Sequence, residues 1–485
     1  MPTEPIFFGN DQKSGLERLG GASPAAINVV TDARGCVRRR PCIATYDEAP
    51  NTVVDANGIY GLHAAETGDV FAVGGLSGAS RSIYRVKDGV ATSLSSGPAR
   101  ELRGSRRPIM AETEALMVFS AGDITQKVVL ATMASTRLDG DPPVSSHIVA
   151  LASTLLANDL VVDRAKTRYS GVATSTAYTG HETWSFGGVG LSGYITSESR
   201  PDAVIAIAEN SNELFVWGAS SVQVFAPGGQ EVFAVASGQE YGLSAPYSVI
   251  KADHQFAWLD QRRRFVLSDG RNFTLIGGAG TVQATVDAMT TVDDCFGYRV
   301  HTGPVDCFVW TFPTSGVTMV YQVGSGWGQW QGFDTPNNWG QFTVRSHAHR
   351  RVDNANIVGT AAGYIGQLEM GGTTDLGTAV NATVTTGFYD RGTDAQKWCK
   401  RVRLAMERGT VDSSTPPVGL LSYADEPDAW CAPIPVSFGA SGDTSVSVVL
   451  DSLGVYRRRA WKFVFPVEVD IALVRVTEEF TVLEQ

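Results

Sequence analysis

The chain has 485 residues, more than a single compact core usually holds, so we expect one large repeat architecture or two to three domains. Charged residues make up 18% of the chain, its formal net charge is −11, and it contains 52 glycines. An acidic chain does not offer the basic surface with which proteins grip nucleic acid, and the 43% apolar residues exclude wholesale disorder. Few charges and many glycines favour short strands joined by tight turns.

The first 50 residues are rich in Gly, Pro and Arg and predict an N-terminal arm or irregular lead-in over residues 1–50. They lack the basic segment followed by a long apolar stretch that marks a secretory signal. No apolar run along the chain approaches 18 residues, so we expect no membrane-spanning helix.

Residues 51–370 predict a β-propeller of about six blades. An apolar strand of about four to six residues, a turn and a second alternating strand recur roughly every 40–55 residues, the spacing of four-stranded propeller blades. The copies lie at 70–89, 116–130, 155–171, 214–229, 255–278, 307–326 and 356–370, the third and the last being the weakest. A large irregular β-sandwich is the alternative architecture.

Two details within this region carry further expectations. Trp217, Trp258 and Trp310 occupy corresponding positions of successive copies, which favours packing between blades over ligand stacking. Residues 147–160 show apolar spacing that fits either a short helix or two strands.

The sequence pattern changes at about residue 371. A Gly/Thr-rich linker is followed by long alternating strands at 380–390, 400–409, 444–453, 459–469 and 471–479. This pattern predicts an all-β, sandwich-like C-terminal domain over residues 371–485, so the whole chain is expected to be all-β.

The sequence contains no phosphate-binding loop, dinucleotide-binding motif, nucleophile elbow or zinc-protease motif. We therefore expect that the protein is not an enzyme and has no catalytic residues. Asp293 with Asp294, and Asp425 with Asp428, are carboxylate groupings, but a glycosidase needs two carboxylates converging in a pocket. The six cysteines form no CxxC pair and predict small buried side chains rather than a metal site.

The histidines give no stronger signal. His347 and His349 lie two apart and could chelate a metal from one face of a strand. Without a companion Asp or Cys set we favour a surface or interface role for them. No metal and no cofactor are expected.

Arginine clusters stand out against the acidic background. Each is either a solvated loop or a docking surface for an acidic neighbouring subunit, since Arg makes bidentate bonds to carboxylates. Our candidate subunit-interface residues are Arg38, Arg39, Arg40, Arg457, Arg458 and Arg459. The aromatic segment 324–333 is a further candidate, as an exposed interface anchor.

The stretch 194–229 resembles the tail-hub proteins of short-tailed phages, also called nozzle or packaged-DNA stabilisation proteins. In that family a Glu-Ser-x-Pro-Asp-like phrase leads into an apolar strand and a Phe-Gly-x-Ser-containing hairpin. The matching positions here are Glu198, Ser199, Pro201, Asp202, Gly218, Ser220, Ser221 and Phe225. The Arg-rich turn within 32–48 and the order of features at 394–406, 422–430 and 454–465 are also similar, so the likeness spans most of the chain.

This resemblance implies a homo-hexameric ring below the portal and its adaptor ring. Such a hub extends the DNA channel, helps retain packaged DNA and docks tail fibre, spike or needle proteins. Double-stranded DNA would pass through the lumen without sequence-specific binding, and the protein would reside in the virion tail after assembly in the host cytoplasm. A carbohydrate-binding or glycoside-cleaving β-propeller is the alternative function.

Overall fold

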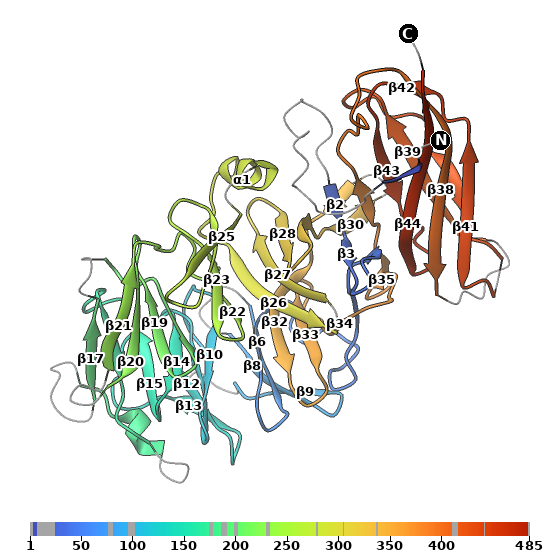
Figure 1. Ribbon diagram of the computed structural model, residues 1–485. Coiled ribbons are helices and arrows are strands. Elements are labelled where there is room, and N and C mark those ends of the chain that lie inside the picture. The colour runs from blue at the N-terminus through green and yellow to red at the C-terminus, as the bar shows by residue number, and fades with distance from the viewer. Residues whose placement is uncertain are drawn as a thin grey trace.

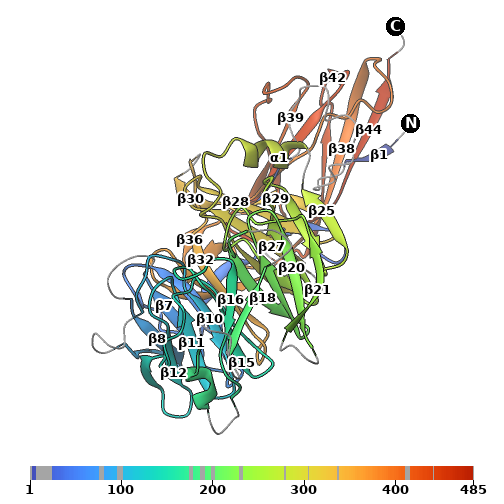
Figure 2. The same cartoon turned by 90° about the vertical axis from the view of Figure 1, so that its left-hand side faces the viewer.

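The computed structural model describes residues 3–6, 25–75, 81–95, 102–173, 178–185, 192–197, 202–228, 233–277, 280–303, 305–335, 338–409, 416–440 and 442–483. These residues form a β-propeller and a C-terminal β domain that lies beyond one side of it (Figures 1 and 2). The predicted all-β propeller with an additional β domain is therefore confirmed.

The propeller has seven blades among the described residues, each built from four antiparallel strands. Blade 1 consists of β6 (Ile59–Ala64), β7 (Val70–Gly74), β8 (Ile83–Lys87) and β9 (Val90–Ser93). Blade 2 consists of β10 (Ile109–Glu112), β11 (Leu116–Ser120), β12 (Gln126–Val129) and β13 (Ala134–Arg137). Blade 3 consists of β14 (Ile148–Leu151), β15 (Thr154–Asn158), β16 (Lys166–Tyr169) and β17 (Gly193–Thr196). Blade 4 consists of β18 (Ala206–Asn210), β19 (Glu213–Trp217), β20 (Val222–Pro227) and β21 (Phe233–Gln239). Blade 5 consists of β22 (Ile250–Ala252), β23 (Gln255–Leu259), β24 (Phe265–Ser268) and β25 (Phe273–Gly277). Blade 6 consists of β26 (Phe296–Thr302), β27 (Val305–Phe312), β28 (Val317–Gln322) and β29 (Gly326–Gln329). Blade 7 consists of β32 (Val344–Arg350), β33 (Ala355–Thr360), β34 (Ile365–Glu369) and the N-terminal strand β5 (Cys42–Thr45).

The second strand of each blade is buried on both faces because neighbouring blades stack against it. All residues of β7, β11 and β15 are buried, which explains the unbroken apolar runs that mark the repeat in the sequence. Seven hydrophobic clusters lie between successive blades, and the last joins blade 7 to blade 1. The ring therefore closes with seven blades, which match the seven candidate copies in the sequence and lie close to the predicted number of about six. Both weak sequence copies, 155–171 and 356–370, are real blades, and residues 147–160 form two strands.

The ring is closed by a strand from the other end of the propeller sequence. β5 pairs antiparallel with β34, so blade 7 contains segments more than 300 residues apart. The main-chain N–H of Ile43 bonds to Asp375, and its carbonyl accepts from Leu376, so the polar groups of Ile43 point away from β34. Those of the next residue, Ala44, must then point toward β34, because successive residues of a strand alternate.

This geometry gives a test of the closure. Ala44→Pro removes an N–H that donates into the β5–β34 ladder, and we expect it to lower the free energy of unfolding by about 1–3 kcal/mol. Thr45→Pro is the matched control, since its N–H points out of the sheet and its loss is expected to cost much less. Urea unfolding followed by Trp fluorescence measures both; equal effects would contradict the assigned closure.

The C-terminal domain consists of two packed sheets that enclose one apolar core. The first contains β3 (Val29–Thr31), β4 (Val37–Arg39), β44 (Ile471–Val482), β38 (Lys397–Arg408) and β41 (Ser445–Asp451), with β1 (Thr3–Ile6) on β44 and β42 (Val455–Tyr456) on β38. The second contains β2 (Ala25–Ile27), β37 (Thr383–Thr385), β43 (Ala460–Val464), β39 (Val418–Ala424) and β40 (Ile434–Ser437). The expected separate arm over residues 1–50 is thus wrong: its described strands complete this domain and blade 7.

One sheet runs through both parts of the molecule. β2 pairs with β37 on one side and, through Ile27 and Gln329, in parallel with β29 of blade 6 on the other. Blade 6 and the second C-terminal sheet thereby form a single nine-stranded sheet. The hydrogen bonds that hold sheets together therefore also hold the two parts of the chain in one orientation.

Few other elements are present in the described part of the chain. They are helix α1 (Gly280–Asp287), a 3-10 turn (Tyr178–Glu182), and the hairpins β30 (Gly332–Thr335) with β31 (Asn338–Gly340) and β35 (Thr374–Asp375) with β36 (Thr378–Ala379). In this part of the chain no helix has the length and apolarity needed to cross a membrane.

Candidate functional site

A cavity of about 340 Å³ lies where the first strands of the seven blades meet. Each blade lines it with residues of its first strand or of the segment leading into that strand. One lining residue from each of blades 1 to 7, in order, is Tyr60, Arg107, His147, Ala206, Tyr247, Phe296 and His347. The cavity is therefore the central channel of the propeller.

Arg107 reaches across one end of this channel. Its Nη1 donates to the carbonyl oxygens of Tyr60, in blade 1, and of Arg345, in blade 7. Its guanidinium lies 3.7 Å from the ring centroid of Phe296, in blade 6. The side chain thus ties three blades to blade 2, and burial lowers the pKa of Arg107 to about 10. It remains protonated at neutral pH.

Two histidine–tyrosine stacks line the same end. His147 lies on Tyr247 with ring centroids 5.1 Å apart, and His347 lies on Tyr298 at the same distance. His147 Nε2 lies 3.0 Å from the Pro246 carbonyl oxygen and its Nδ1 lies 3.0 Å from Ser146 Oγ. Since a carbonyl can only accept, Nε2 carries the proton and Nδ1 accepts from the hydroxyl, so the neutral ring is fully bonded.

The stacked histidines predict a dependence of stability on pH. Burial lowers the pKa of both His147 and His347 from 6.5 to about 4, with the nearby Arg106 adding to the effect on His147. Between pH 4 and 6.5 the unfolded chain binds more protons than the folded chain. The contribution of the neutral histidines to the free energy of unfolding is therefore fully present above about pH 6.5 and decreases as the pH falls toward 4. His147 alone is expected to lower the free energy of unfolding by about 2 kcal/mol at pH 5, relative to neutral pH. Unfolding midpoints of the wild type and His147→Gln measure this; equal slopes between pH 6.5 and 5 would contradict it.

The other end of the channel carries two carboxylates that are each paired with a basic side chain. His63 Nε2 lies 2.9 Å from Glu112 Oε2, and Lys251 Nζ lies 2.6 Å from Glu209 Oε1. Glu209 is the one carboxylate among the described residues that line the cavity. A glycosidase needs two carboxylates flanking the scissile bond, whereas the described residues that line the cavity supply one, already paired with Lys251.

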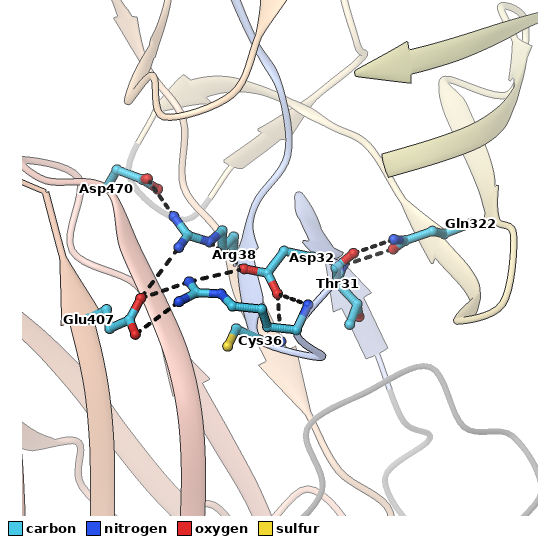
Figure 3. Close-up of polar contacts among 8 residues, drawn as sticks. Thr31, Asp32, Cys36, Arg38, Gln322, Glu407 and Asp470 are labelled. Carbon is cyan, nitrogen blue, oxygen red and sulfur yellow. Dashed lines mark hydrogen bonds and ion pairs between the residues drawn. The ribbon is translucent and has the colours of Figure 1, made fainter. Parts of the chain in front are cut away.

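The predicted Arg38–Arg40 cluster lies at the junction between the propeller and the C-terminal domain. Arg38 forms ion pairs with Asp32 at 2.9 Å and with Asp470 at 3.3 Å, and its Nη2 lies 3.8 Å from Glu407 (Figure 3). On the propeller side, the main-chain N–H of Thr31 donates to Gln322 of β28 at 2.8 Å (Figure 3). The β3–β4 hairpin therefore connects blade 6 to β38 and β44.

The next two arginines of this cluster are buried and point into the junction. Arg39 is 2% exposed and donates to the carbonyl oxygens of Pro466, Val469 and Gly372. Arg40 is 1% exposed and forms a two-pronged ion pair with Asp375. Both guanidiniums are used within the chain, so a subunit-interface role for Arg39 and Arg40 is wrong.

Arg40 is also held from its other sides. It donates to Asn28 Oδ1 at 3.0 Å and to the Pro41 carbonyl oxygen at 2.8 Å. Its guanidinium lies 4.6 Å from the ring centroid of Phe342 and 5.9 Å from that of Trp330. These contacts come from the segments flanking β3 to β5, the segment between blades 6 and 7, and the C-terminal linker, so Arg40 is the centre of the junction.

The Arg457–Arg459 cluster is divided in the same way. Arg459 is 1% exposed and forms a two-pronged ion pair with Asp425 at 2.6 and 2.8 Å, so an interface role for Arg459 is also wrong. Arg457 is exposed and donates to the Asp394 carbonyl oxygen, and Arg458 is partly buried over Phe388. An interface role for Arg38, Arg457 and Arg458 stays a prediction.

The stretch that carries the phage resemblance forms a capped hairpin. Asp202 accepts hydrogen bonds from the Ser220 N–H at 2.8 Å, the Ser220 hydroxyl at 2.6 Å and the Ser221 hydroxyl at 3.4 Å. A Cβ at Gly218 would lie 2.6 Å from the Cβ of Asp202, so a glycine is required there. Phe225 is buried between blades 3 and 4, while Glu198, Ser199 and Pro201 lie outside the described residues.

Removing this cap is expected to weaken blade 4. Asp202→Ala leaves three donors of the β19–β20 turn without their acceptor, and we expect a loss of about 1–3 kcal/mol in the free energy of unfolding. Glu114→Ala, at an exposed carboxylate, is the control and should stay within about 0.5 kcal/mol of the wild type. Thermal unfolding compares them; a neutral Asp202→Ala would show that the cap adds nothing.

The tryptophans singled out in the sequence lie in the core of the propeller. Trp217, Trp258 and Trp310 are fully buried, and Trp217 contacts Trp258 across blades 4 and 5, which confirms the predicted role in packing. The segment 324–333 is not an exposed aromatic loop: Trp327 is 7% and Trp330 1% exposed, because both pack between blades.

The weaker candidates lie in separate places. His347 lines the channel while His349 is exposed and bonded to Asn354, and no cluster of three or more metal-binding side chains occurs among the described residues. Asp293 and Asp294 lie in the propeller, whereas Asp425 and Asp428 lie in the C-terminal domain. Five cysteines are buried as predicted, and Cys431 is partly exposed.

No family model matches the chain, and no curated protein matches its sequence. Among solved structures it is similar to the N-terminal domain of Nup159, with 10% identity and a TM-score of 0.41 over 71% of this chain and 99% of that one. It is also similar to BamB from Moraxella catarrhalis, with 9% identity and a TM-score of 0.41 over 76% of this chain and 98% of that one. The propeller itself is established by its seven blades and their closure.

Proposed function

We propose that the chain is a structural subunit of a phage tail hub, which assembles as a hexameric ring below the adaptor and forms part of the DNA exit conduit. In this role it acts through its shape and its contacts rather than through catalysis. It would help retain packaged DNA and dock fibres, spikes or a needle.

The observation that carries the proposal is the rigid joint between the propeller and the C-terminal domain. A nine-stranded sheet crosses the joint, and the buried Arg39 and Arg40 fasten it. A conduit wall has to keep its domains in one orientation under the pressure of packaged DNA. A hinge between the two domains would serve an enzyme that opens and closes. Among the described residues, paired strands cross this joint instead.

Composition and sequence add support. Six copies of a chain with a net charge of −11 would present an acidic ring, which repels phosphate at short range and lets DNA slide. The stretch 194–229 resembles tail-hub proteins, and its Asp202, Gly218 and Ser220 lie together in one turn. The alternative, a glycoside-cleaving propeller, needs a pair of free carboxylates, and the described residues that line the channel include one carboxylate, which is paired.

Assembly with the adaptor tests the proposal. Mass photometry of the purified chain mixed with its adaptor should show a species containing six copies of the 51.7 kDa chain, an increment of about 310 kDa. The double variant Arg457→Glu/Arg458→Glu is expected to weaken the ring, whereas Arg262→Glu, at another exposed arginine, should not. A chain that stays monomeric with adaptor present would contradict the proposal.

A further inference from the structure

Strand β41 forms a free edge on the outside of the C-terminal domain. It is the last strand of the first sheet, pairs with β38 over all seven of its residues, and has no strand on its other side among the described residues. Figure 1 shows it on the side of the domain that lies away from the propeller. A strand in this position offers a row of unpaired main-chain N–H and C=O groups to another strand.

The main-chain groups that face this free edge follow from the bonds at the two ends of β41. At one end the carbonyl of Thr444 accepts from the N–H of Arg408, and at the other the N–H of Ser452 donates to the carbonyl of Lys400. Both ends thus point toward β38, and the register between them has no shift. Because successive residues of a strand alternate, the outward groups are those of the odd-numbered residues, Ser445, Ser447, Val449 and Asp451.

β41 lacks the features that normally protect an exposed edge, which are short length, proline, bulges and charged side chains. Its one charged residue, Asp451, is the last and is already paired with Arg401 at 2.7 Å. The free edge of the second sheet, by contrast, is the four-residue strand β40, with Pro435 inside it. The outer strand of blade 4, β21, also has seven residues, but a bulge at Ala236 interrupts it. The unprotected edge of β41 therefore indicates a partner strand.

The apolar side chains of β41 are covered on one side only. Val446, Val448 and Leu450 pack against the core of the domain yet remain partly exposed. On the outer face of the same strand, Val449 is 41% exposed. A strand beside β41 would remove part of this apolar surface from water, and for the inner face it needs apolar residues at alternate positions.

We propose that β41 pairs with the β41 strand of a second copy of this chain, antiparallel about a two-fold axis at Val448. Full overlap of the two strands sets this register, and the edge is then complementary to itself. Apolar residues meet apolar residues on the inner face, no like charges lie opposite each other, and the outward main-chain groups of both strands form the hydrogen-bonded pairs. The resulting pairs are Val448 with its own copy, Val446 with Leu450, Ser447 with Val449, and Ser445 with Asp451.

This contact goes beyond the proposed ring and is independent of it. A six-fold ring is built from head-to-tail contacts, whereas this contact is two-fold, so the pair belongs to the free chain in solution. A contact through one strand edge lies at the small end of specific interfaces, and we expect a dissociation constant on the order of 10 µM. Ring assembly with the adaptor and pairing of the free chain are measured in separate experiments, and either can fail alone.

Sedimentation velocity of the full-length chain between about 1 and 100 µM tests the association. The wild type is expected to shift from 51.7 kDa toward twice that mass as its concentration rises. Ser447→Pro removes an N–H that faces the second copy and none that bonds to β38, so it should remain folded and weaken association at least tenfold. Ser447→Thr keeps this N–H and is the matched control, which should associate as the wild type does.

A second variant keeps the result decisive if Ser447→Pro fails to fold. Val449→Lys leaves every main-chain bond in place and puts a charge into the contact, so it should also weaken association. A wild type that stays monomeric at about 100 µM, ten times the expected dissociation constant, would overturn the proposal. Association that is unchanged in both variants would overturn it too.

A disulfide tests the two-fold register. In the proposed pair the two copies of Val448 face each other in a non-hydrogen-bonded pair, where the main chains approach closely enough for a disulfide. Val448→Cys should therefore give a covalent dimer on oxidation, whereas Val446→Cys, which lies opposite Leu450, should not. The wild type, in which Cys431 is partly exposed, controls for the native thiols. Equal cross-linking of the two variants, or none in either, would contradict the proposed pairing.

Discussion

Arg40→Ala is expected to lower the free energy of unfolding by about 3–5 kcal/mol, the largest effect of any single substitution that we predict. The change leaves the Asp375 carboxylate, 12% exposed, without its cation and removes the hydrogen bond to Asn28. It also opens a space beside Trp330 and Phe342. Breaking a buried ion pair from one side is costly because the remaining charge stays buried.

Urea unfolding monitored by circular dichroism measures this effect. Arg262→Ala is the matched control, because Arg262 is exposed, and it should change stability by less than about 0.5 kcal/mol. A two-domain chain can unfold in steps, so the midpoints of both transitions are compared. If Arg40→Ala behaves like the control, the junction is not held by Arg40.

Arg459→Ala is expected to lower the free energy of unfolding by about 2–4 kcal/mol, and Arg457→Ala by less than about 0.5 kcal/mol. The two residues are two positions apart, yet Arg459 lies 4.0 Å from the ring centroid of Tyr423 and 4.4 Å from that of Tyr456, and pairs with Asp425. We place the cost below that of Arg40→Ala because the Asp425 side chain is 37% exposed and water can solvate it after the change. Thermal unfolding of the two variants checks the contrast, and similar losses in both would contradict the assigned burial.

The blades were predictable because their second strands are buried on both faces. A strand such as Val70–Gly74 has no solvent face, so it shows as a continuous apolar run. Two of these runs are weaker in the sequence because polar residues interrupt them: Thr154–Asn158 ends in a buried Asn, and Ala355–Thr360 contains Asn356. Both polar side chains are hydrogen-bonded inside the fold, which the sequence does not reveal.

The roles of the N-terminal strands were not predictable from the sequence. β3 and β5 have three and four residues, too few for a periodic pattern. Their partners are remote: Ile43 bonds to Asp375, 332 positions later. Only the folded topology brings these segments together.

The buried arginines were missed for a related reason. Arginine is usually exposed, so a run of three predicts a solvated surface. Arg39 and Arg40 are buried because carbonyl oxygens and a carboxylate from segments near residues 372, 375 and 466–469 converge on them. Arg107 was missed although it directly follows Arg106, because nothing in the sequence shows that a side chain just before this strand lines the channel. The Pro108 that follows it, and its place at the start of a repeat, were the only local signals.

Cryo-electron microscopy of the virion tail tests whether the chain is a rigid wall subunit of a phage tail. We expect six copies of the propeller and C-terminal domain around the axis below the adaptor ring. Each copy should fit the density as one body, with the domains oriented as in Figure 1. Tails without this density, or with the two domains in varying relative orientations, would contradict the account.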